Sequence, residues 1–377
     1  MKTVGKEVCF LGTGEGNPRN GEGAFIRLSD GRIMYAFTKY DGDSWLDHAI
    51  AGISACVSCD EGESWSKPAS LIEKEAWAEN IMSVSLLRLS DGRIMIVYLR
   101  KTRTEDGRIL CMPVIRYSSD ECETFTEAKN VDLADGYYVL INDGATVAAD
   151  GRIYIPLSYH CKAYDVKLGA GDEPKTVHIL YSDDLGESFQ EFRTVFQSPH
   201  ASDKVGLAEP GIYEHEDGSL FLWCRTALGF QYSALSLDRG KTWSALEPNL
   251  RFTSPDSPMR VKRVGELTVA VFNPYGYSCL REGKELWGSP KRTPLALAVS
   301  QDDGHSFSSV GKPAYNGGLS EFSKNVYLIE DDERDSYCYP AIIGTEDGFL
   351  VAYYHSAGTR QCLNATRIKK VLFSELT

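Results

Sequence analysis

The sequence predicts an all-β fold, a six-bladed β-propeller with Asp-box repeats that forms a single domain over residues 1–377. Two observations lead to this prediction. A hairpin motif recurs six times, and a second motif, Ser-x-Asp-x-Gly-x-Ser/Thr followed by an aromatic residue, recurs about every 60 residues. A repeat of this length fits one four-stranded sheet. Six such sheets in a ring would protect one another's edges.

The first motif is a hairpin turn followed by a strand, as in LSDGRIMYAF and LSDGRIMIVY. Asp-Gly between apolar and β-branched residues is a strong local sign of a tight hairpin, because such a turn needs positive φ and Gly adopts it at little cost. Strands are therefore expected on both sides of each turn. The six copies lie around Asp30, Asp91, Asp150, Asp217, Gly265 and Asp347.

The second motif, the Asp box, is expected to be structural. Its aspartate can accept hydrogen bonds from amides of its own turn, and its aromatic residue can pack between strands, so no direct catalytic role is predicted. In the degenerate copy that begins at Ser118, Cys122 stands where the other boxes have Gly, which predicts a distorted or wider turn. The full copies begin at Ser58, Ser182, Ser236 and Ser300.

The composition excludes several classes of protein. With 42% hydrophobic residues the chain can form a core, yet no apolar run approaches the ~18 residues of a membrane helix. A net charge of −13 with scattered basic residues disfavours a nucleic-acid partner. Ten irregularly spaced cysteines and the lack of a secretory signal predict a cytoplasmic location. Cys56 and Cys59 form a C-x-x-C without a second pair, so no metal or other cofactor is predicted.

Five residues share one register relative to the hairpins. In a propeller the innermost strand of each blade lines the channel mouth, so residues at a fixed offset before each hairpin should occupy equivalent central places. Eight residues before the hairpin aspartate the side chains are polar or amphipathic, although the segments around them are rich in apolar residues. The shared register favours a functional rim made of Glu22, Ser83, Asn142, Glu209 and Tyr339.

These features resemble the sialidase (neuraminidase) family of glycoside hydrolases, over essentially the whole chain. In that family a glutamate stands shortly before the fourth hairpin and an arginine shortly after it, as Glu209 and Arg225 do here. A further family arginine precedes a later Asp box, as Arg292 precedes Ser300, and a tyrosine precedes the last hairpin, as Tyr339 does. The resemblance implies that these residues form the centre of an active site.

The family's acid/base aspartate lies in a loop shortly before the first Asp box, and the resemblance assigns that role to Asp47. Asp43 and Asp41 are nearby alternatives. His48 is another, because the ordinary pKa of histidine suits proton transfer.

The resemblance departs from the family at the first blade. Sialidases carry there an aromatic-Arg-Ile-Pro motif, whereas this chain has Glu22 near the equivalent place and Arg19 three residues earlier. Either Arg19 reaches the pocket and supplies a third positive charge, or the acceptor for the substrate carboxylate is altered. The exact sugar therefore stays open.

The resemblance implies an exo-glycosidase that removes a terminal sialic acid or related acidic sugar with retention of configuration. Tyr339 would attack, because a neutral phenol is not repelled by the substrate carboxylate. Glu209 would take the phenol proton. Arg225 and Arg292 would hold the carboxylate by paired hydrogen bonds. Asp47, protonated in the resting protein, would donate to the leaving oxygen and then activate water.

Further residues are candidates for the same pocket, and for each of them a purely structural role is an equally good alternative. Aromatic side chains that could stack on a sugar are Trp45, Tyr137 and Tyr138. Further substrate-binding candidates are Arg100, Asn142, Asp143, His160 and Gln231.

Two other function classes stay open. One is a non-catalytic propeller that binds an acidic sugar, although binding alone does not require both Glu209 and Tyr339. The other is a glycosidase or intramolecular trans-glycosidase that acts on another carboxylated sugar. In each case the predicted partner is a small molecule or oligosaccharide that carries a carboxylate.

Overall fold

The computed structural model describes residues 2–167, 174–200, 203, 205–274, 292–307, 325–332, 334–356 and 363–376. The regular secondary structure of these residues consists of β-strands and one short 3-10 helix, η1 (Phe373–Glu375). Within the described ranges no helix is long and apolar enough to cross a membrane. The prediction of an all-β fold is confirmed.

Four of the five sheets have four antiparallel strands. The first, in the order β2-β3-β4-β5, has the bounds Asn20–Arg27, Ile33–Tyr40, Ala51–Ser58 and Ala69–Ile72. The sheet β15-β16-β17-β18 has the bounds Ala208–Glu214, Leu220–Arg225, Phe230–Ser236 and Glu247–Thr253. The sheet β19-β20-β21-β22 has the bounds Arg260–Val264, Leu267–Phe272, Leu295–Ser300 and Val326–Glu330. The sheet β1-β25-β24-β23 has the bounds Lys6–Leu11, Ala365–Leu372, Gly348–His355 and Tyr337–Gly344.

The fifth sheet has nine strands and consists of two antiparallel groups. They are joined where β10 pairs in parallel with β8, through Tyr137 and Cys111. One group is β6 (Asn80–Arg88), β7 (Ile94–Arg103), β8 (Ile109–Ser118) and β9 (Lys129–Asn130). The other is β10 (Tyr137–Val139), β11 (Thr146–Val147), β12 (Ile153–Cys161), β13 (Thr176–Ser182) and β14 (Gln190–Glu191).

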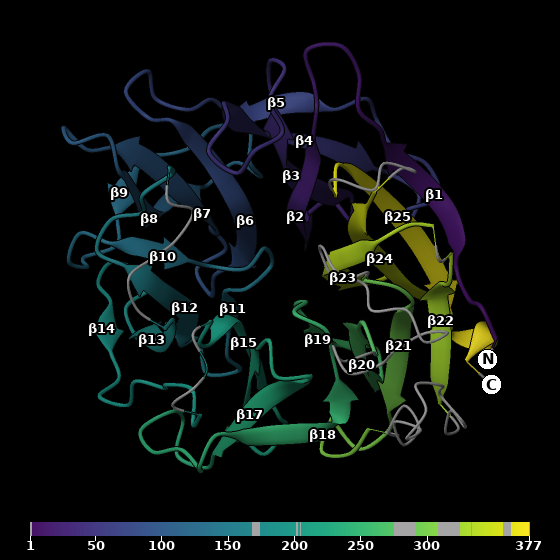
Figure 1. Cartoon of the computed structure of the whole chain (residues 1–377). Helices are drawn as coiled ribbons and strands as arrows, with labels where there is room; N and C mark the ends of the chain where they lie inside the picture. The colour runs from purple at the N-terminus through teal and green to yellow at the C-terminus, as the bar shows by residue number, and fades with distance from the viewer. Residues whose placement is uncertain are drawn as a thin grey trace.

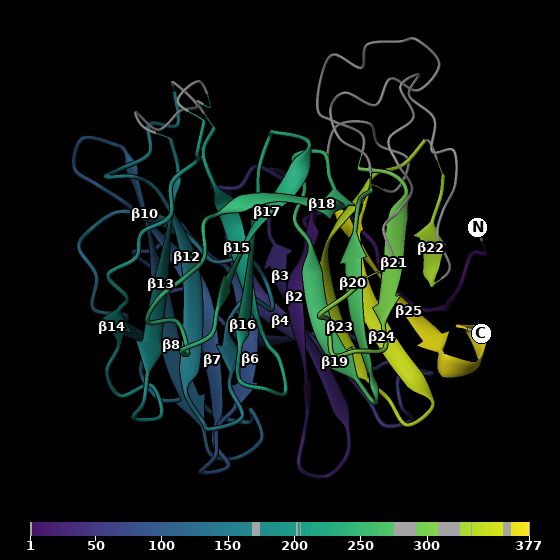
Figure 2. The ribbon, with the colours of Figure 1, turned by 90° about the horizontal axis from the view of Figure 1, so that it is seen from below.

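The sheets lie around the middle of the molecule, with β2, β6, β15, β19 and β23 nearest the centre (Figure 1). Contacts join β2 to β6 and to β23, β15 to β12 and to β19, and β19 to β23. Seen from the side, the strands run between two ends of the molecule, where the loops gather (Figure 2). Side chains of neighbouring inner strands can therefore converge although they lie far apart in the sequence.

The core lies between neighbouring sheets. Trp223 on β16, for example, belongs to one apolar cluster with Phe272 on β20 and Ala298 on β21. Another cluster joins Phe37 of the first sheet to Leu350 of β24. Each sheet is thus held by packing against the next one.

The Asp boxes have the predicted hydrogen bonds, but the prediction for the degenerate box is wrong. The amide of Cys122 donates to Ser118 Oγ at 2.8 Å, as the amide of Gly62 donates to Ser58 Oγ at 2.9 Å. The amide of Thr124 donates to Asp120 Oδ1 at 2.9 Å, as in the other boxes. Cys122 adopts the same left-handed conformation as the glycines, with φ of 71°, because these hydrogen bonds hold the turn closed. The turn is therefore neither wider nor distorted.

Candidate active site

Four of the five residues that lie eight positions before a hairpin aspartate interrupt the regular pairing of the inner strands. Glu22, Ser83, Glu209 and Tyr339 have positive φ, between 44° and 57°, and each lies where the pairing of its strand with the next one shifts register. Positive φ is uncommon for residues other than glycine and is often found at functional sites. In the third repeat the positive φ belongs to Asp143, one residue later than predicted.

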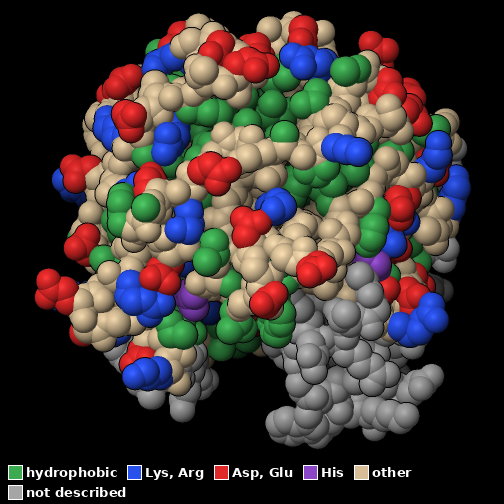
Figure 3. All heavy atoms as spheres, turned by 90° about the horizontal axis from the view of Figure 1, so that it is seen from above, with side chains coloured by type: hydrophobic (Ala, Val, Ile, Leu, Met, Phe, Trp, Pro, Cys, Tyr) green, Lys and Arg blue, Asp and Glu red, His purple; other side chains and the backbone are tan. Residues whose placement is uncertain are grey.

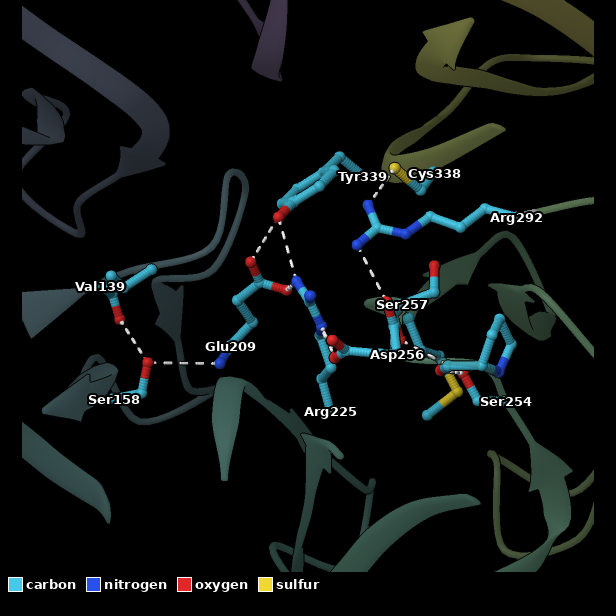
Figure 4. Close-up of polar contacts among 12 residues, drawn as sticks. Val139, Ser158, Glu209, Arg225, Ser254, Asp256, Ser257, Arg292, Cys338 and Tyr339 are labelled. Carbon is cyan, nitrogen blue, oxygen red and sulfur yellow. Dashed lines mark hydrogen bonds and ion pairs between the residues drawn. The ribbon is translucent and has the colours of Figure 1, made fainter. Parts of the chain in front are cut away.

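Tyr339, Glu209 and Arg225 converge from β23, β15 and β16 (Figure 4). The phenol of Tyr339 donates to Glu209 Oε1 at 2.5 Å. Arg225 Nη1 donates to Glu209 Oε2 at 2.7 Å and to the Tyr339 oxygen at 3.2 Å. Burial, followed by the charge of Glu209, raises the pKa of Tyr339 well above its ordinary value. The phenol is therefore neutral and already hydrogen-bonded to a carboxylate that can accept its proton.

Arg292 lies beside this triad, with its guanidinium carbon 5.6 Å from the centre of the Tyr339 ring. Its Nη1 donates to Cys338 Sγ at 3.0 Å and its Nη2 to the Asp256 carbonyl at 2.9 Å (Figure 4). Its Nε is buried and lacks an acceptor. Within the described residues no carboxylate pairs with this guanidinium, so its charge is available for an anion.

Asp256 is a site residue that the sequence analysis missed. Its Oδ1 accepts from Arg225 Nε at 2.5 Å, and its carbonyl accepts from Arg292. Burial raises the pKa of Asp256, but the charge and hydrogen bond of Arg225, together with the charges of Arg292 and Lys175, outweigh burial and lower that pKa overall. Asp256 follows no hairpin register, so no sequence signal pointed to it.

Gln231 lies behind the site. It is completely buried, and its Nε2 donates to Ser254 Oγ at 3.0 Å and to the Ser257 carbonyl at 2.8 Å. These bonds hold the loop that carries Asp256. Gln231 therefore supports the loop, and the predicted contact with a substrate finds no support in this position.

Arg19 forms a second cluster next to the first. Its Nη1 donates to Asp47 Oδ1 at 2.5 Å, its Nη2 to Glu22 Oε1 at 2.7 Å and its Nε to the Tyr354 hydroxyl at 2.8 Å. Tyr354 packs edge-to-face on Tyr339, with ring centres 5.7 Å apart, so the two clusters adjoin. Arg19 thus reaches the centre, as the first of the two alternatives from the sequence requires. Its charge, however, is neutralised by Asp47 and Glu22.

The predicted resting state of Asp47 is wrong. Desolvation raises the pKa of Asp47, but the charges of Arg19 and Lys101 outweigh it and hold this pKa well below its usual range. The side chain, 63% exposed, is therefore a carboxylate at neutral pH. Burial, followed by the Lys101 charge, lowers the pKa of His48 to about 4, so the imidazole is neutral and a poorer proton donor than predicted. The alternative Asp41 pairs with Lys39 at 2.5 Å instead.

Arg100 does not belong to the site. Its Nη1 donates to Glu75 Oε1 at 3.1 Å, its other Nη to Asn130 on the outer strand β9, and its guanidinium carbon lies 4.5 Å from the Trp77 ring. Successive side chains of a strand point to opposite faces. It is the next residue, Lys101, that is almost completely buried and donates to the Asp47 carbonyl at 2.6 Å.

Asn142 and Asp143 have structural partners. Asn142 Nδ2 donates to the carbonyls of Gly23 at 2.8 Å and Tyr339 at 3.3 Å, which supports the backbone of the candidate nucleophile. The Asp143 carboxylate pairs with Lys262 Nζ at 3.0 Å. Neither side chain pairs with the site arginines, so the predicted contact with a substrate is not supported for them.

His160 and the candidate stacking residues are mainly structural. His160 Nε2 lies 3.1 Å from Ser158 Oγ, and burial lowers its pKa well below the ordinary value. Tyr137 and Tyr138 are 7% exposed and belong to the core. Trp45, which is 41% exposed in the loop of Asp47, is the one of the three aromatic candidates that can offer a ring face to a ligand.

One group of possible metal ligands lies outside the site. His215, Asp303 and His305 bring ligand atoms within 4.8 Å of one another. The two imidazoles stack almost parallel, with centres 4.1 Å apart, so their in-plane lone pairs do not converge. The Asp303 carboxylate already accepts from the Tyr213 hydroxyl at 2.5 Å and pairs with Arg263. This arrangement does not form a coordination site.

The cysteines of the C-x-x-C motif differ in environment. Cys56 is buried, Cys59 is exposed, and both are free thiols. Cys279 and Cys362 lie outside the described residues.

Comparison with known proteins decides the family. The family model of the BNR repeat-like domain matches residues 101–352. The chain belongs to the BNR repeat-like family. No curated protein matches this BNR repeat-like chain.

Several solved structures share the fold of this BNR repeat-like protein. A Dyadobacter fermentans protein of unknown function is 17% identical, with a TM-score of 0.69 over 97% of this chain and 98% of that one. The intramolecular trans-sialidase from Ruminococcus gnavus is 13% identical, with a TM-score of 0.69 over 98% and 97%. The leech intramolecular trans-sialidase is 14% identical, with a TM-score of 0.68 over 100% and 71%. Identities this low establish the fold alone.

Proposed function

We propose that the protein is a sialidase-like exo-glycosidase that removes a terminal sugar carrying a carboxylate. The observation that carries the proposal is the convergence of Tyr339, Glu209 and Arg225, at 2.5, 2.7 and 3.2 Å. Beside them lies Arg292, whose guanidinium is paired with no carboxylate of the described residues. The two solved structures named as intramolecular trans-sialidases support it through their shared fold.

The geometry suits a retaining mechanism. Arg292 attracts the substrate carboxylate, with Arg225 next to it beside Tyr339. That carboxylate would repel an anionic nucleophile but not a neutral phenol. Tyr339 Oη forms a bond to the anomeric carbon while its proton passes to Glu209 and the bond to the leaving oxygen breaks. Tyrosine nucleophiles of sialidases are a recognised exception to the rule of two carboxylates. Water then attacks the covalent intermediate.

Asp47 is the proposed proton donor to the leaving oxygen. Because its ion pair with Arg19 favours the carboxylate, Asp47 must first gain a proton. Proton donation is therefore expected to become more effective as the pH falls. The same residue, once ionised, can activate the water of the second step.

The sugar need not be a sialic acid. Arg19 is paired with Asp47 and Glu22, and Arg225 with Glu209 and Asp256, so of the three arginines only Arg292 has no carboxylate partner among the described residues. This observation favours a second candidate, a glycosidase or intramolecular trans-glycosidase for another carboxylated sugar. We keep the non-catalytic binder as an outcome of the test.

The proposal also covers the architecture of the protein, its type of ligand and its location in the cell. Six groups of strands around a centre, with the nine-stranded sheet counted as two groups joined at one parallel bridge, support a single-domain six-bladed propeller. On the side of the molecule drawn in Figure 3, acidic and basic side chains are interspersed and no basic patch forms, which suits a small saccharide better than nucleic acid. We propose a cytoplasmic location, where such saccharides would be imported.

Incubation with 4-methylumbelliferyl sialoside tests the proposal. We expect turnover by the native chain and a loss of at least about 10³-fold in Tyr339→Phe, because the nucleophile is removed. Tyr138→Phe, a buried tyrosine outside the site, is the control and should keep its activity. Native-like turnover by Tyr339→Phe would refute the nucleophile.

Product analysis and calorimetry distinguish the remaining candidate functions. The mass of the released sugar distinguishes hydrolysis from an anhydro product. Heat of binding in calorimetry with free sialic acid, without turnover of the sialoside, would favour the non-catalytic binder.

A further inference from the structure

The loop that carries Asp47 is held mainly by polar contacts, together with ring contacts of His48 to Tyr137 and Tyr164. It connects β3 to β4, and its residues Trp45, Leu46 and Ile50 are 41%, 56% and 56% exposed. Its carbonyls at alternate positions point to buried donors: that of Trp45 accepts from Arg19 at 3.3 Å, and those of Asp47 and Ala49 accept from a neighbouring sheet.

The donors of the neighbouring sheet are Asn80 on β6 and Lys101 on β7, which face each other across the ladder. Asn80 Nδ2 donates to the Asp47 carbonyl at 2.9 Å and to the Ala49 carbonyl at 2.8 Å. Lys101 Nζ donates to the same Asp47 carbonyl at 2.6 Å, the one hydrogen-bond acceptor that the described residues offer it. Both donors are almost completely buried, with exposures of 0% and 2%.

Two donors on one carbonyl restrict the peptide group that follows the Asp47 Cα. A buried amide or ammonium is costly unless its hydrogen bonds are made, so the pair favours the one loop position that supplies these carbonyls. The Cα of Asp47 is then held in one position, although its side chain is exposed. General acid catalysis depends on such placement, because the donor must lie within hydrogen-bond reach of the leaving oxygen.

We propose that Asn80 and Lys101 are positioning residues for Asp47, which act by anchoring its loop to strands β6 and β7. The inference rests on the proposed function of Asp47 as proton donor. It assigns no contact with the substrate to either residue.

The dependence of the rate on the leaving group tests this inference. An aryl leaving group departs without a proton, whereas a sugar alkoxide requires one, so a misplaced acid slows the second substrate selectively. The two probes are 4-methylumbelliferyl sialoside and sialyllactose. Asn80→Ser removes both carbonyl contacts without changing the charge. Lys101→Met removes one contact together with a charge.

We expect Asn80→Ser to lose at least about tenfold more kcat on sialyllactose than on the aryl sialoside, with KM little changed, as part of the 10²–10⁴-fold effect typical of a general acid. Lys101→Met should show the same selectivity and should move the basic limb of the pH profile upward, since a positive charge near Asp47 is lost. Arg100→Met is the matched control: Arg100 is the neighbour on β7 and contacts Glu75 and Asn130 instead. This variant should lose both activities equally or not at all.

Equal losses on both substrates in Asn80→Ser would overturn the inference while leaving the proposed function intact. If the native chain turns over neither probe, the proposed function fails for this sugar, and hydrogen exchange decides the positioning role. Amides of residues 45–49 should then exchange at least about tenfold faster in Asn80→Ser than in Arg100→Met. Unchanged exchange would overturn it.

Discussion

At the scale of single residues, the site is defined by which charges are already compensated. Arg225 is paired with Glu209 and Asp256, and Arg19 with Asp47 and Glu22. A buried guanidinium with a carboxylate partner has little attraction left for a second anion. Of these three arginines, Arg292, whose acceptors among the described residues are a thiol and a carbonyl, therefore most strongly favours a bound carboxylate.

The ionisation of Asp47 predicts a pH effect on catalysis. The pKa of Asp47 lies below its ordinary value in the ligand-free protein, so its protonated fraction falls as the pH rises through the acid range. We expect the ratio of kcat/KM for sialyllactose to that for the aryl sialoside to increase as the pH is lowered from 7 towards 4. Steady-state profiles on the two substrates measure this ratio. A ratio that is constant with pH would exclude Asp47 as the proton donor.

At the scale of elements, the Asp boxes convert local hydrogen bonds into closed turns. In the box of Ser118 the aspartate carboxylate accepts from the Thr124 hydroxyl and amide and from the serine hydroxyl, and these bonds lower the pKa of Asp120 to about 2. The hydroxyl and amide of Ser188 likewise lower the pKa of Asp184 to about 2. The ordinary value is 3.8 for both residues.

These depressed pKa values predict a loss of stability in acid. A carboxyl group whose pKa is lower in the folded state stabilises the protein above its unfolded pKa, and this contribution is lost as the pH falls through the folded value. Calorimetric Tm values should therefore fall between about pH 4 and pH 2. Asp120→Asn should show a smaller fall than Asp132→Asn, a substitution of an exposed aspartate outside the boxes. Equal slopes for the two variants would contradict the argument.

At the scale of the whole molecule, the start of the chain completes the sheet made by its end. Strand β1 pairs with β25 from Lys6 to Leu11, and Val4 and Leu11 are buried in the core. Without β1, one edge of β25 would lose its partner and present unpaired backbone groups. Sheets that pack in sequence around a centre depend on such a link between the two ends of the chain.

Deletion of residues 2–11 tests the importance of this link. Loss of the two buried apolar side chains alone removes about 3–6 kcal/mol of hydrophobic stabilisation from the folded state. We expect Tm to fall by several degrees and the protein to aggregate more readily. A synthetic peptide of residues 2–11, added in excess, should restore part of the lost Tm. An unchanged Tm after deletion would show that β1 contributes little.

The sequence by itself determined the strands, the turns and the central register. Asp-Gly turns and Asp boxes are local chemistry, so their positions could be predicted without any contact between distant residues. The same regularity identified Glu209 and Tyr339 by their common offset from the hairpins. It could not reveal that a non-glycine residue, Cys122, adopts the left-handed turn unchanged.

Only the tertiary structure decided which side chains meet. Asp256 and Asn80 follow no repeat register, and the choice between Arg100 and Lys101 depends on which face of β7 points inward. The protonation of Asp47 was likewise beyond the sequence. It depends on the charges of Arg19, just before β2, and of Lys101 on β7. The energy of a charge pair is set by distance and burial, which neighbouring residues in the chain do not specify.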